Sequence, residues 1–267
     1  MKTLVLATLV AVAGCGGGGG GGSVRSLTPP DGKAGDSPRL SPDGKSIAYK
    51  LNRNGAAEPD QIVVVGLDGS GSHMVASAEF IDGLVWAPDG SKLYFTSNLG
   101  VQSVPLAGGT PTQVGDSFAA LNPDISPDGK TLVWGVNGGS LETLDLSTAG
   151  ARKVTLGPGS APRFSHDGKR IAFLEGPKYT LKVMDLATKQ VTELVDTDSY
   201  LSTVAWYADD QHIAYLSKQG IEKISLADKS HQLLRDEFAA KDMDMTADGK
   251  TVVYAINGQE LIFIATF

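Results

Sequence analysis

Short apolar stretches alternate with polar turns along almost the whole chain after residue 22. Segments such as 61–65, 83–86 and 191–195 are rich in β-branched or aromatic residues and end at turn-forming residues, as strands do. Outside the first residues, no segment has convincing helical periodicity. The pattern therefore predicts an all-β chain.

A turn motif recurs six times between these strands. The first copy reads Ser-Pro-Asp-Gly-Lys from Ser41, and the last reads Thr-Ala-Asp-Gly-Lys from Thr246. Proline presets φ, aspartate caps the turn and glycine accepts a left-handed conformation, so the motif suits a tight turn. The copies begin at residues 41, 87, 126, 165, 207 and 246, a mean period of 41 residues. A period near 40 with several short strands per unit predicts a β-propeller.

Each repeat contains one strand before the motif and three after it, which makes one four-stranded antiparallel blade. The end segments 23–40 and 246–267 are each about half a repeat. We therefore expect a six-bladed β-propeller in which segment 24–28 pairs beside 261–264 and closes the ring, removing exposed sheet edges. Three aromatic residues directly precede the motif, and we expect them to pack between blades: Trp86, Phe164 and Trp206.

Composition narrows the function classes. The chain has 267 residues with a net charge of −7, which argues against a nucleic-acid-binding surface. A single cysteine excludes an internal disulfide framework and a multi-cysteine zinc site. Charged residues make up only 20%, which argues against wholesale disorder.

The first 23 residues have a different character from the rest. Lys2 precedes an apolar run over 4–13 that is too short to span a bilayer but matches a secretory signal over 1–14. The sequence Val-Ala-Gly-Cys ending at Cys15 resembles the bacterial lipoprotein signal box, which implies cleavage before Cys15 and its acylation. Seven glycines at 16–22 then form a flexible spacer, giving a tether over 15–23. The alternative is an ordinary signal peptide with a chance cysteine.

The resemblance to lipoproteins also bears on location. In Gram-negative lipoproteins an aspartate after the cysteine retains the protein in the inner membrane, and this chain has Gly16 there. The expected location is therefore the outer membrane, facing the periplasm. In a Gram-positive host it is the outer surface of the cell membrane.

Over residues 24–267 the repeats resemble those of the TolB family. Four of the six copies keep Asp-Gly-Lys, a fifth keeps Pro-Asp-Gly, and the copy at Tyr207 has lost both proline and glycine. The α/β domain that precedes the propeller in that family has no counterpart in these 267 residues. The resemblance implies an envelope partner, such as a peptidoglycan-associated lipoprotein.

The search for catalytic chemistry finds little. No Gly-x-Ser-x-Gly nucleophile elbow is present. Three histidines fall in expected turns and one begins a second strand, away from the first strands that line a propeller channel: His73, His166, His231 and His212. The aspartates around Asp244 match no calcium loop. We expect no catalytic residue, no metal and no cofactor.

One set of positions favours a site at the propeller axis. Since strand side chains alternate, the residues two before each motif share one face near the axis. In blade order they are Arg39, Val85, Asp124, Arg163, Ala205 and Asp244. Neighbouring blades place Asp124 beside Arg163 and Asp244 beside Arg39. These charges either form two structural ion pairs or line a channel for a peptide terminus or small anion.

The loops between blades favour a second surface, an acidic rim on one face. It consists of Glu79, Asp82, Asp116, Asp196, Asp198, Asp236 and Glu237. The long loop at 52–61 belongs to the same face. Such a rim either binds a partner or is simply solvated.

Together these features predict a monomeric, lipid-anchored envelope propeller that acts as a protein-interaction scaffold rather than as an enzyme. Two alternatives remain open. One is a propeller lyase or hydrolase, and the other is a sensor that binds a small ligand in the channel.

Overall fold

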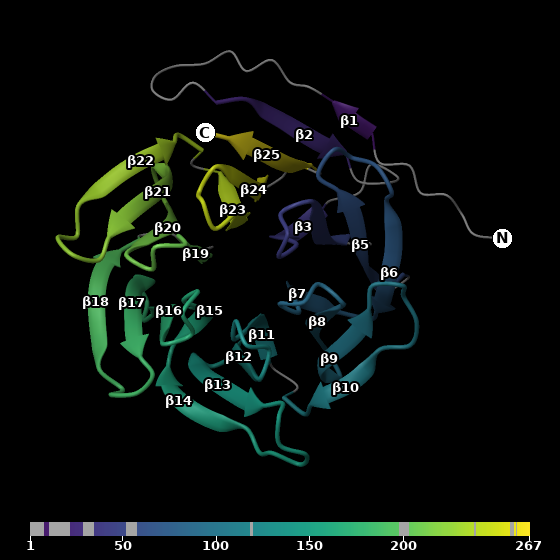
Figure 1. Cartoon of the computed structure of the whole chain (residues 1–267), viewed down its shortest axis with the longest axis horizontal. Coiled ribbons are helices and arrows are strands. Elements are labelled where there is room, and N and C mark those ends of the chain that lie inside the picture. The colour runs from purple at the N-terminus through teal and green to yellow at the C-terminus, as the bar shows by residue number, and fades with distance from the viewer. Residues whose placement is uncertain are drawn as a thin grey trace.

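The computed structural model describes residues 8–10, 22–28, 35–51, 58–117, 120–197, 203–237, 239–256, 259 and 261–267. Its strands form six antiparallel sheets arranged in a ring about a central axis (Figure 1). This arrangement confirms the six-bladed β-propeller predicted from the repeats. No helix in these residues is long and apolar enough to cross a membrane.

Blades one to three follow the chain in order, each from its innermost to its outermost strand. Blade one comprises β3 (Gly35–Leu40), β4 (Ser46–Leu51), β5 (Asp60–Gly66) and β6 (His73–Ala78). Blade two comprises β7 (Ile81–Trp86), β8 (Lys92–Ser97), β9 (Gly100–Pro105) and β10 (Thr112–Gly115). Blade three comprises β11 (Ala120–Ile125), β12 (Thr131–Val136), β13 (Ser140–Asp145) and β14 (Val154–Pro158).

Blades four to six complete the ring. Blade four comprises β15 (Ser160–Phe164), β16 (Arg170–Glu175), β17 (Thr180–Asp185) and β18 (Val191–Asp196). Blade five comprises β19 (Val204–Trp206), β20 (His212–Ser217), β21 (Gly220–Ser225) and β22 (His231–Arg235). Blade six comprises β23 (Ala240–Met245), β24 (Thr251–Ile256), β25 (Ile262–Thr266), β2 (Val24–Thr28) and β1 (Thr8–Val10).

The two ends of the chain meet in blade six, as the sequence predicted. The N-terminal strand β2 pairs antiparallel with the C-terminal strand β25, with Val24 opposite Ala265 and Leu27 opposite Ile262. Leu27 is fully buried in a cluster with residues of blades one and six. This pairing closes the ring and removes the edges that an open array would expose.

A fifth strand in blade six was not predicted. β1 pairs antiparallel with β2, with Leu9 opposite Leu27 (Figure 1). An apolar run of high β-propensity adds readily to the free edge of an outer strand. β1 lies within the segment 1–14 that the sequence predicts to be a signal, and cleavage before Cys15 would remove it and leave β2 as the outermost strand.

The turn motif repeats because its side chains satisfy its own backbone. In the first copy the Ser41 hydroxyl donates to Asp43 Oδ1 over 2.6 Å and accepts from the Ser46 amide over 2.9 Å. The Lys45 amide also donates to Asp43 Oδ1, over 3.1 Å. Gly44 has φ of 68°, a conformation that favours glycine. The copies that begin at Ser126, Ser165 and Thr246 form the same bonds.

Blade five departs from the motif, and the structure gives the reason. Asp210 occupies the glycine position with φ of 50°. Its carboxylate accepts hydrogen bonds from the amides of His166 at 2.8 Å and Asp167 at 2.9 Å, in the turn of blade four. Aspartate tolerates the left-handed conformation better than most residues. Aspartate at this position is conformationally less favourable than glycine, but its side chain links blade five to blade four.

The core lies between neighbouring blades. A large aromatic side chain from each second strand is buried: Tyr49, Phe95, Trp134, Phe173, Tyr215 and Tyr254. Trp86 packs with residues of blades one and two, Phe164 with those of blades three and four, and Trp206 with those of blades four and five. The packing role predicted for these three residues is confirmed.

Candidate functional site

The innermost strands are irregular just before the residues that the sequence placed at the axis. The pairing of β3, β11 and β15 with the next strand shifts register before Arg39, Asp124 and Arg163. Ser37, Asn122 and Ala161, two residues before them, have φ of 50°, 47° and 46°, and a proline follows each. Bulges of this kind bend a strand and redirect its side chains.

Four charged side chains meet at one end of the axis. Arg39, Asp124, Arg163 and Asp244 line a single cavity of about 180 Å³. Pro42 and Pro88, from the turn motifs after β3 and β7, also line it. The structure thus brings the four predicted channel residues together, at the end of the axis that carries the turn motifs.

The two aspartates join adjacent blades through the backbone. Asp124 Oδ2 accepts a hydrogen bond of 2.7 Å from the Phe164 amide, and Asp244 Oδ2 accepts one of 2.8 Å from the Leu40 amide. Burial raises the pKa of both carboxyls, against the opposing charges of Arg163 and Arg39 respectively. Within the described part of the chain, both aspartates are therefore held by neighbouring backbone and not by a direct ion pair.

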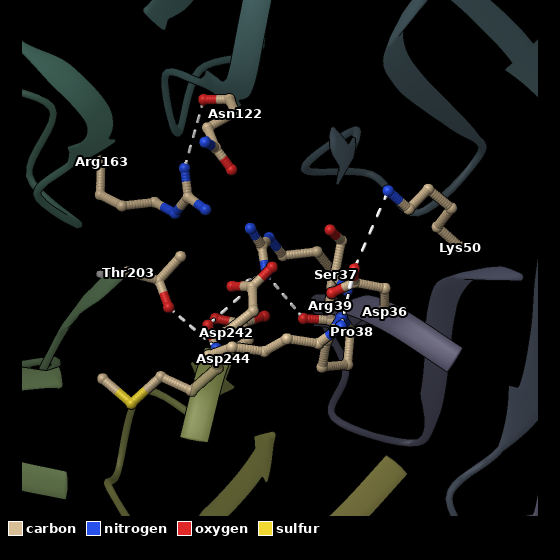
Figure 2. A network of polar contacts seen from close by, with 12 residues as sticks. Asp36, Ser37, Pro38, Arg39, Lys50, Asn122, Arg163, Thr203, Asp242 and Asp244 are labelled. Carbon is tan, nitrogen blue, oxygen red and sulfur yellow. Dashed lines mark hydrogen bonds and ion pairs between the residues drawn. The ribbon is translucent and has the colours of Figure 1, made fainter. Parts of the chain in front are cut away.

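Arg39 has a carboxylate partner that the sequence analysis missed. Its Nη1 lies 3.1 Å from Asp242 Oδ1, and both side chains are more than nine-tenths buried. The same nitrogen donates to the Pro38 carbonyl over 2.8 Å (Figure 2). The expected pairing of Arg39 with Asp244 is thus corrected: Asp244 lies near enough to act through its charge, but Asp242 makes the ion pair. The bulge in β23 lies before Asp242, and the pairing is continuous from Asp242 to Met245, so Asp242 shares the inward face of Asp244 as strand alternation requires.

Arg163 has no carboxylate within ion-pair distance among the described residues. Its Nη1 donates to the Pro162 carbonyl at 2.8 Å and, at 3.5 Å, to the Asn122 carbonyl (Figure 2). Burial, and then the positive charge of Arg39, lower the pKa of Arg163. For Arg39 the carboxylates of Asp242 and Asp244 outweigh burial and raise the pKa.

The axial residues follow an approximate twofold pattern that relates blades one to three to blades four to six. Trp86 Nε1 donates to the Arg39 carbonyl over 3.0 Å, and Trp206 Nε1 donates to the Arg163 carbonyl over 3.0 Å. The hydrogen bonds from the Leu40 amide to Asp244 and from the Phe164 amide to Asp124 are related by the same twofold pattern. Blades two and five thus fix the backbone from which each arginine projects.

The opposite end of the innermost strands contains a second set of charges. Asp36 Oδ2 lies 3.0 Å from Lys241 Nζ and 3.9 Å from Lys50 Nζ. Burial alone would raise the pKa of Asp36, but the two lysines lower it. Blade six and blade one are therefore linked at both ends of their first strands.

Asp82, predicted in the acidic rim, is not a rim residue. It lies inside β7, and its Oδ2 accepts a hydrogen bond of 3.0 Å from the Asn122 amide of blade three. Burial raises its pKa. The strand begins earlier than the loop pattern suggested, so Asp82 joins blades as Asp124 and Asp244 do.

The other described rim residues lie at or beyond the ends of outer strands, and local partners hold most of them. Glu79 accepts from Asn98 over 2.9 Å, and Asp116 lies 3.8 Å from Lys153. Asp196 accepts from Thr180 over 2.6 Å, and Glu237 lies 3.7 Å from Arg235. Asp236 is exposed. Asp198, residues 52–57 and Cys15 lie outside the described residues.

The rim and the axial cavity are at opposite ends of the innermost strands. Glu79 and Asp116 precede β7 and β11, whereas the cavity contains turn residues that follow β3 and β7. A partner that inserts into the cavity therefore approaches the turn-motif face. Of the histidines, His73, His212 and His231 each begin a strand and His166 lies in a turn, so only His166 occupies a turn as predicted for three of them.

Comparison with known proteins bears on the fold. No family model matches the chain. No curated protein matches it either. Among solved structures it is similar to TolB from Acinetobacter baumannii, with a TM-score of 0.64 and 20% identity, over 84% of this chain and 64% of that chain. It is also similar to a chain of the nidogen/laminin complex, with a TM-score of 0.63 and 12% identity, over 75% of this chain and 83% of that one. The chain thus spans less than two thirds of that TolB, and these likenesses show a TolB-like β-propeller fold.

Proposed function

We propose that this chain is a protein-interaction scaffold of the bacterial cell envelope, attached to a membrane by a lipid on Cys15. The observation that carries the proposal is the convergence of Arg39, Asp124, Arg163 and Asp244 on one axial cavity. Bonds between blades hold these groups on a closed ring, so little conformational entropy is lost when a partner binds. The partner is an envelope protein or peptide whose end enters the cavity from the turn-motif face.

The structural neighbours are consistent with this role. One is a TolB, and another is a chain of a complex between nidogen and laminin. A peptidoglycan-associated lipoprotein is the partner that the TolB resemblance suggests. We assign the chain no catalytic residue, metal or cofactor, and we propose that it acts as a monomer.

The lipid anchor fits the position of the N-terminal strand. β2 lies outside β25 in blade six, away from the axis (Figure 1). A tether that ends where β2 begins therefore joins the ring at its outer edge, away from the axial cavity. We propose the outer membrane, facing the periplasm, as the location, or the outer surface of the cell membrane in a Gram-positive host.

The experiment combines lipid labelling with crosslinking in intact cells of the source organism. A photoreactive residue replaces Pro88, which lines the cavity, and as a control it replaces Val154, which is 58% exposed on an outer strand. We expect an envelope protein to crosslink from position 88 and not from position 154. We also expect palmitate labelling to disappear in Cys15→Ser. Crosslinking at neither position, or equal crosslinking at both, would contradict the scaffold role, and labelling that persists in Cys15→Ser would contradict the anchor.

A second candidate function, a small-ligand sensor, is favoured by the size of the cavity. A volume of about 180 Å³ corresponds to roughly six water molecules at ~30 Å³ each. A thermal-shift screen of envelope metabolites tests it: stabilisation by a metabolite without any crosslinked partner would favour the sensor. Turnover of a substrate by the purified protein would instead favour the lyase or hydrolase alternative.

A further inference from the structure

The approximate twofold pattern at the axis is broken at one position. Asp242 of blade six pairs opposite Ala255, and the residue at the equivalent position of blade three is Leu121, opposite Gly135. Asp242 forms the ion pair with Arg39, at 3.1 Å. Both arginines donate over 3.5 Å to an equivalent backbone carbonyl, Arg39 to that of Met243 and Arg163 to that of Asn122, but Leu121 supplies no carboxylate. Arg163 is therefore an arginine in the same setting as Arg39, without the carboxylate that neutralises Arg39.

Both guanidinium groups also have buried nitrogens without an acceptor among the described residues. These are Nη2 of Arg163, and Nε and Nη2 of Arg39. Arg163 is 8% exposed and Arg39 is 4% exposed, and both line the axial cavity. Figure 2 shows the two guanidinium groups extending from opposite sides toward one another. Leaving a buried N–H donor without an acceptor costs free energy. A ligand that supplies acceptor oxygens to these nitrogens would therefore bind favourably in the cavity.

The charges around the cavity limit what that ligand can be. Among the described residues, Asp242 alone lies within ion-pair distance of either arginine, and Asp124 and Asp244 instead accept backbone hydrogen bonds from the next blade. Their negative charges nevertheless lie in the same cavity and would repel a dianion such as phosphate more than a monoanion. A carboxylate has one charge and two oxygens, and it matches the planar fork of a guanidinium.

The apolar residues that line the cavity indicate what kind of group carries the carboxylate. Val85, Trp86 and Ile125 supply apolar surface beside the two arginines. A cavity of about 180 Å³ has room for the end of a chain but not for a strand running through it. A C-terminal residue with a short apolar side chain fits both the polar and the apolar walls.

We propose that Arg163, with Arg39 opposite it, binds the C-terminal carboxylate of a partner peptide. This inference rests on the proposed scaffold function and specifies the chemistry of the partner. Asn122 is then a specificity residue, because its carbonyl accepts from Arg163 and an aspartate there would add a negative charge beside that guanidinium.

The test measures binding of short peptides to the purified protein by calorimetry. The probes are N-acetyl-alanyl-alanine with a free carboxylate, the same peptide with a C-terminal amide, an amidated N-acetyl-alanyl-glutamyl-alanine, and inorganic phosphate. We expect the free C-terminal carboxylate to bind at least about tenfold more tightly than the other three, since hydrogen bonds to charged groups carry this discrimination. Equal binding of the amide would overturn the proposal, and tighter binding of the glutamyl peptide or of phosphate would replace the C-terminus with a side chain or an inorganic anion.

Two substitutions with opposite expected effects separate recognition from folding. Asn122→Asp should weaken binding of the free-carboxylate peptide about tenfold or more, and Asp242→Asn should strengthen it by freeing Arg39. Asn122 has φ of 47°, which aspartate also tolerates, and Gln113→Glu on β10 is a control that adds a negative charge away from the cavity. If Asn122→Asp folds and binds like the wild type, the inference fails even where crosslinking at position 88 succeeds. If the peptide binds as expected but no partner crosslinks, the scaffold role fails and the carboxylate site remains.

Discussion

The carboxylate of Asp244 accepts a hydrogen bond of 2.8 Å from the backbone amide of Leu40, across the boundary where blade six meets blade one. The equivalent bond from Phe164 to Asp124 joins blades three and four. Hydrogen bonds within each sheet hold a blade together, but they do not set how neighbouring blades meet. The two aspartates supply that connection near the axis, at two opposite boundaries of the ring.

Removing one of these connections should destabilise the whole ring. Asp124→Ala leaves the Phe164 amide without its acceptor in a buried setting, which costs about 1–3 kcal/mol in the free energy of unfolding. Asp124→Asn retains an acceptor oxygen and should lose less. Urea denaturation measures both, with Asp116→Ala in an exposed loop as the control. An Asp124→Ala variant as stable as Asp116→Ala would show that this bond contributes nothing.

The closing strand should contribute strongly to stability through Leu27. This side chain is fully buried opposite Ile262, so Leu27→Ala should lower the free energy of unfolding by about 2–5 kcal/mol. Leu233→Ala is a matched control, since Leu233 is 46% exposed and its loss should change stability by only about 0.5 kcal/mol. Deleting residues 23–28 should lower Tm sharply for the same reason. Similar values for the two leucine variants, or an unchanged Tm after the deletion, would contradict closure by β2.

The sequence predicted the number of blades and the closure because both depend on local patterns. Each turn motif satisfies its own backbone, as Ser41 and Asp43 do, so six copies can be counted without tertiary information. The remaining half-repeats at 23–40 and 246–267 then have to form one blade. The added strand β1 was missed because its residues match a secretory signal equally well.

The charged pairing at the axis was harder to predict, because three of the innermost strands contain bulges. Alternation correctly directed Arg39, Arg163 and Asp244 toward one cavity. Alternation also places Asp242, two residues before Asp244 in continuous pairing, on the same face, and this spacing is the sequence signal for the ion pair with Arg39. Alternation could not show that Asp82 lies within a strand.

Restoring the consensus glycine in blade five should destabilise the protein. Asp210→Gly relieves a left-handed aspartate but removes the acceptor for the His166 and Asp167 amides. Hydrogen bonds to a charged group contribute about 1.5–3 kcal/mol each, which exceeds the conformational gain of about 1 kcal/mol. We therefore expect a lower Tm by calorimetry, with Asp210→Asn intermediate because its side chain has one acceptor oxygen. A higher Tm for Asp210→Gly would mean that backbone strain outweighs the link between blades.

Acid should destabilise the protein through the aspartates of the turn motifs. The Ser41 hydroxyl and the Lys45 amide lower the pKa of Asp43, and Ser126 and Lys130 lower that of Asp128 in the same way, from an ordinary value of 3.8. A carboxyl whose pKa is lower in the folded state binds fewer protons there than in the unfolded state. Its contribution to stability is therefore complete above pH 3.8 and is lost as the pH falls through the lowered pKa.

The buried aspartates between blades should act in the opposite direction, and this difference makes the pH dependence testable. Burial raises the pKa of Asp82, so the folded state gains protons first and protonation of this group favours folding. Between neutral pH and pH 3, the combined variant Asp43→Asn and Asp128→Asn should lose less stability than the wild type, whereas Asp82→Asn should lose more. Urea midpoints across this range measure both effects. Parallel pH profiles for the three proteins would mean that neither set of carboxyls controls acid unfolding.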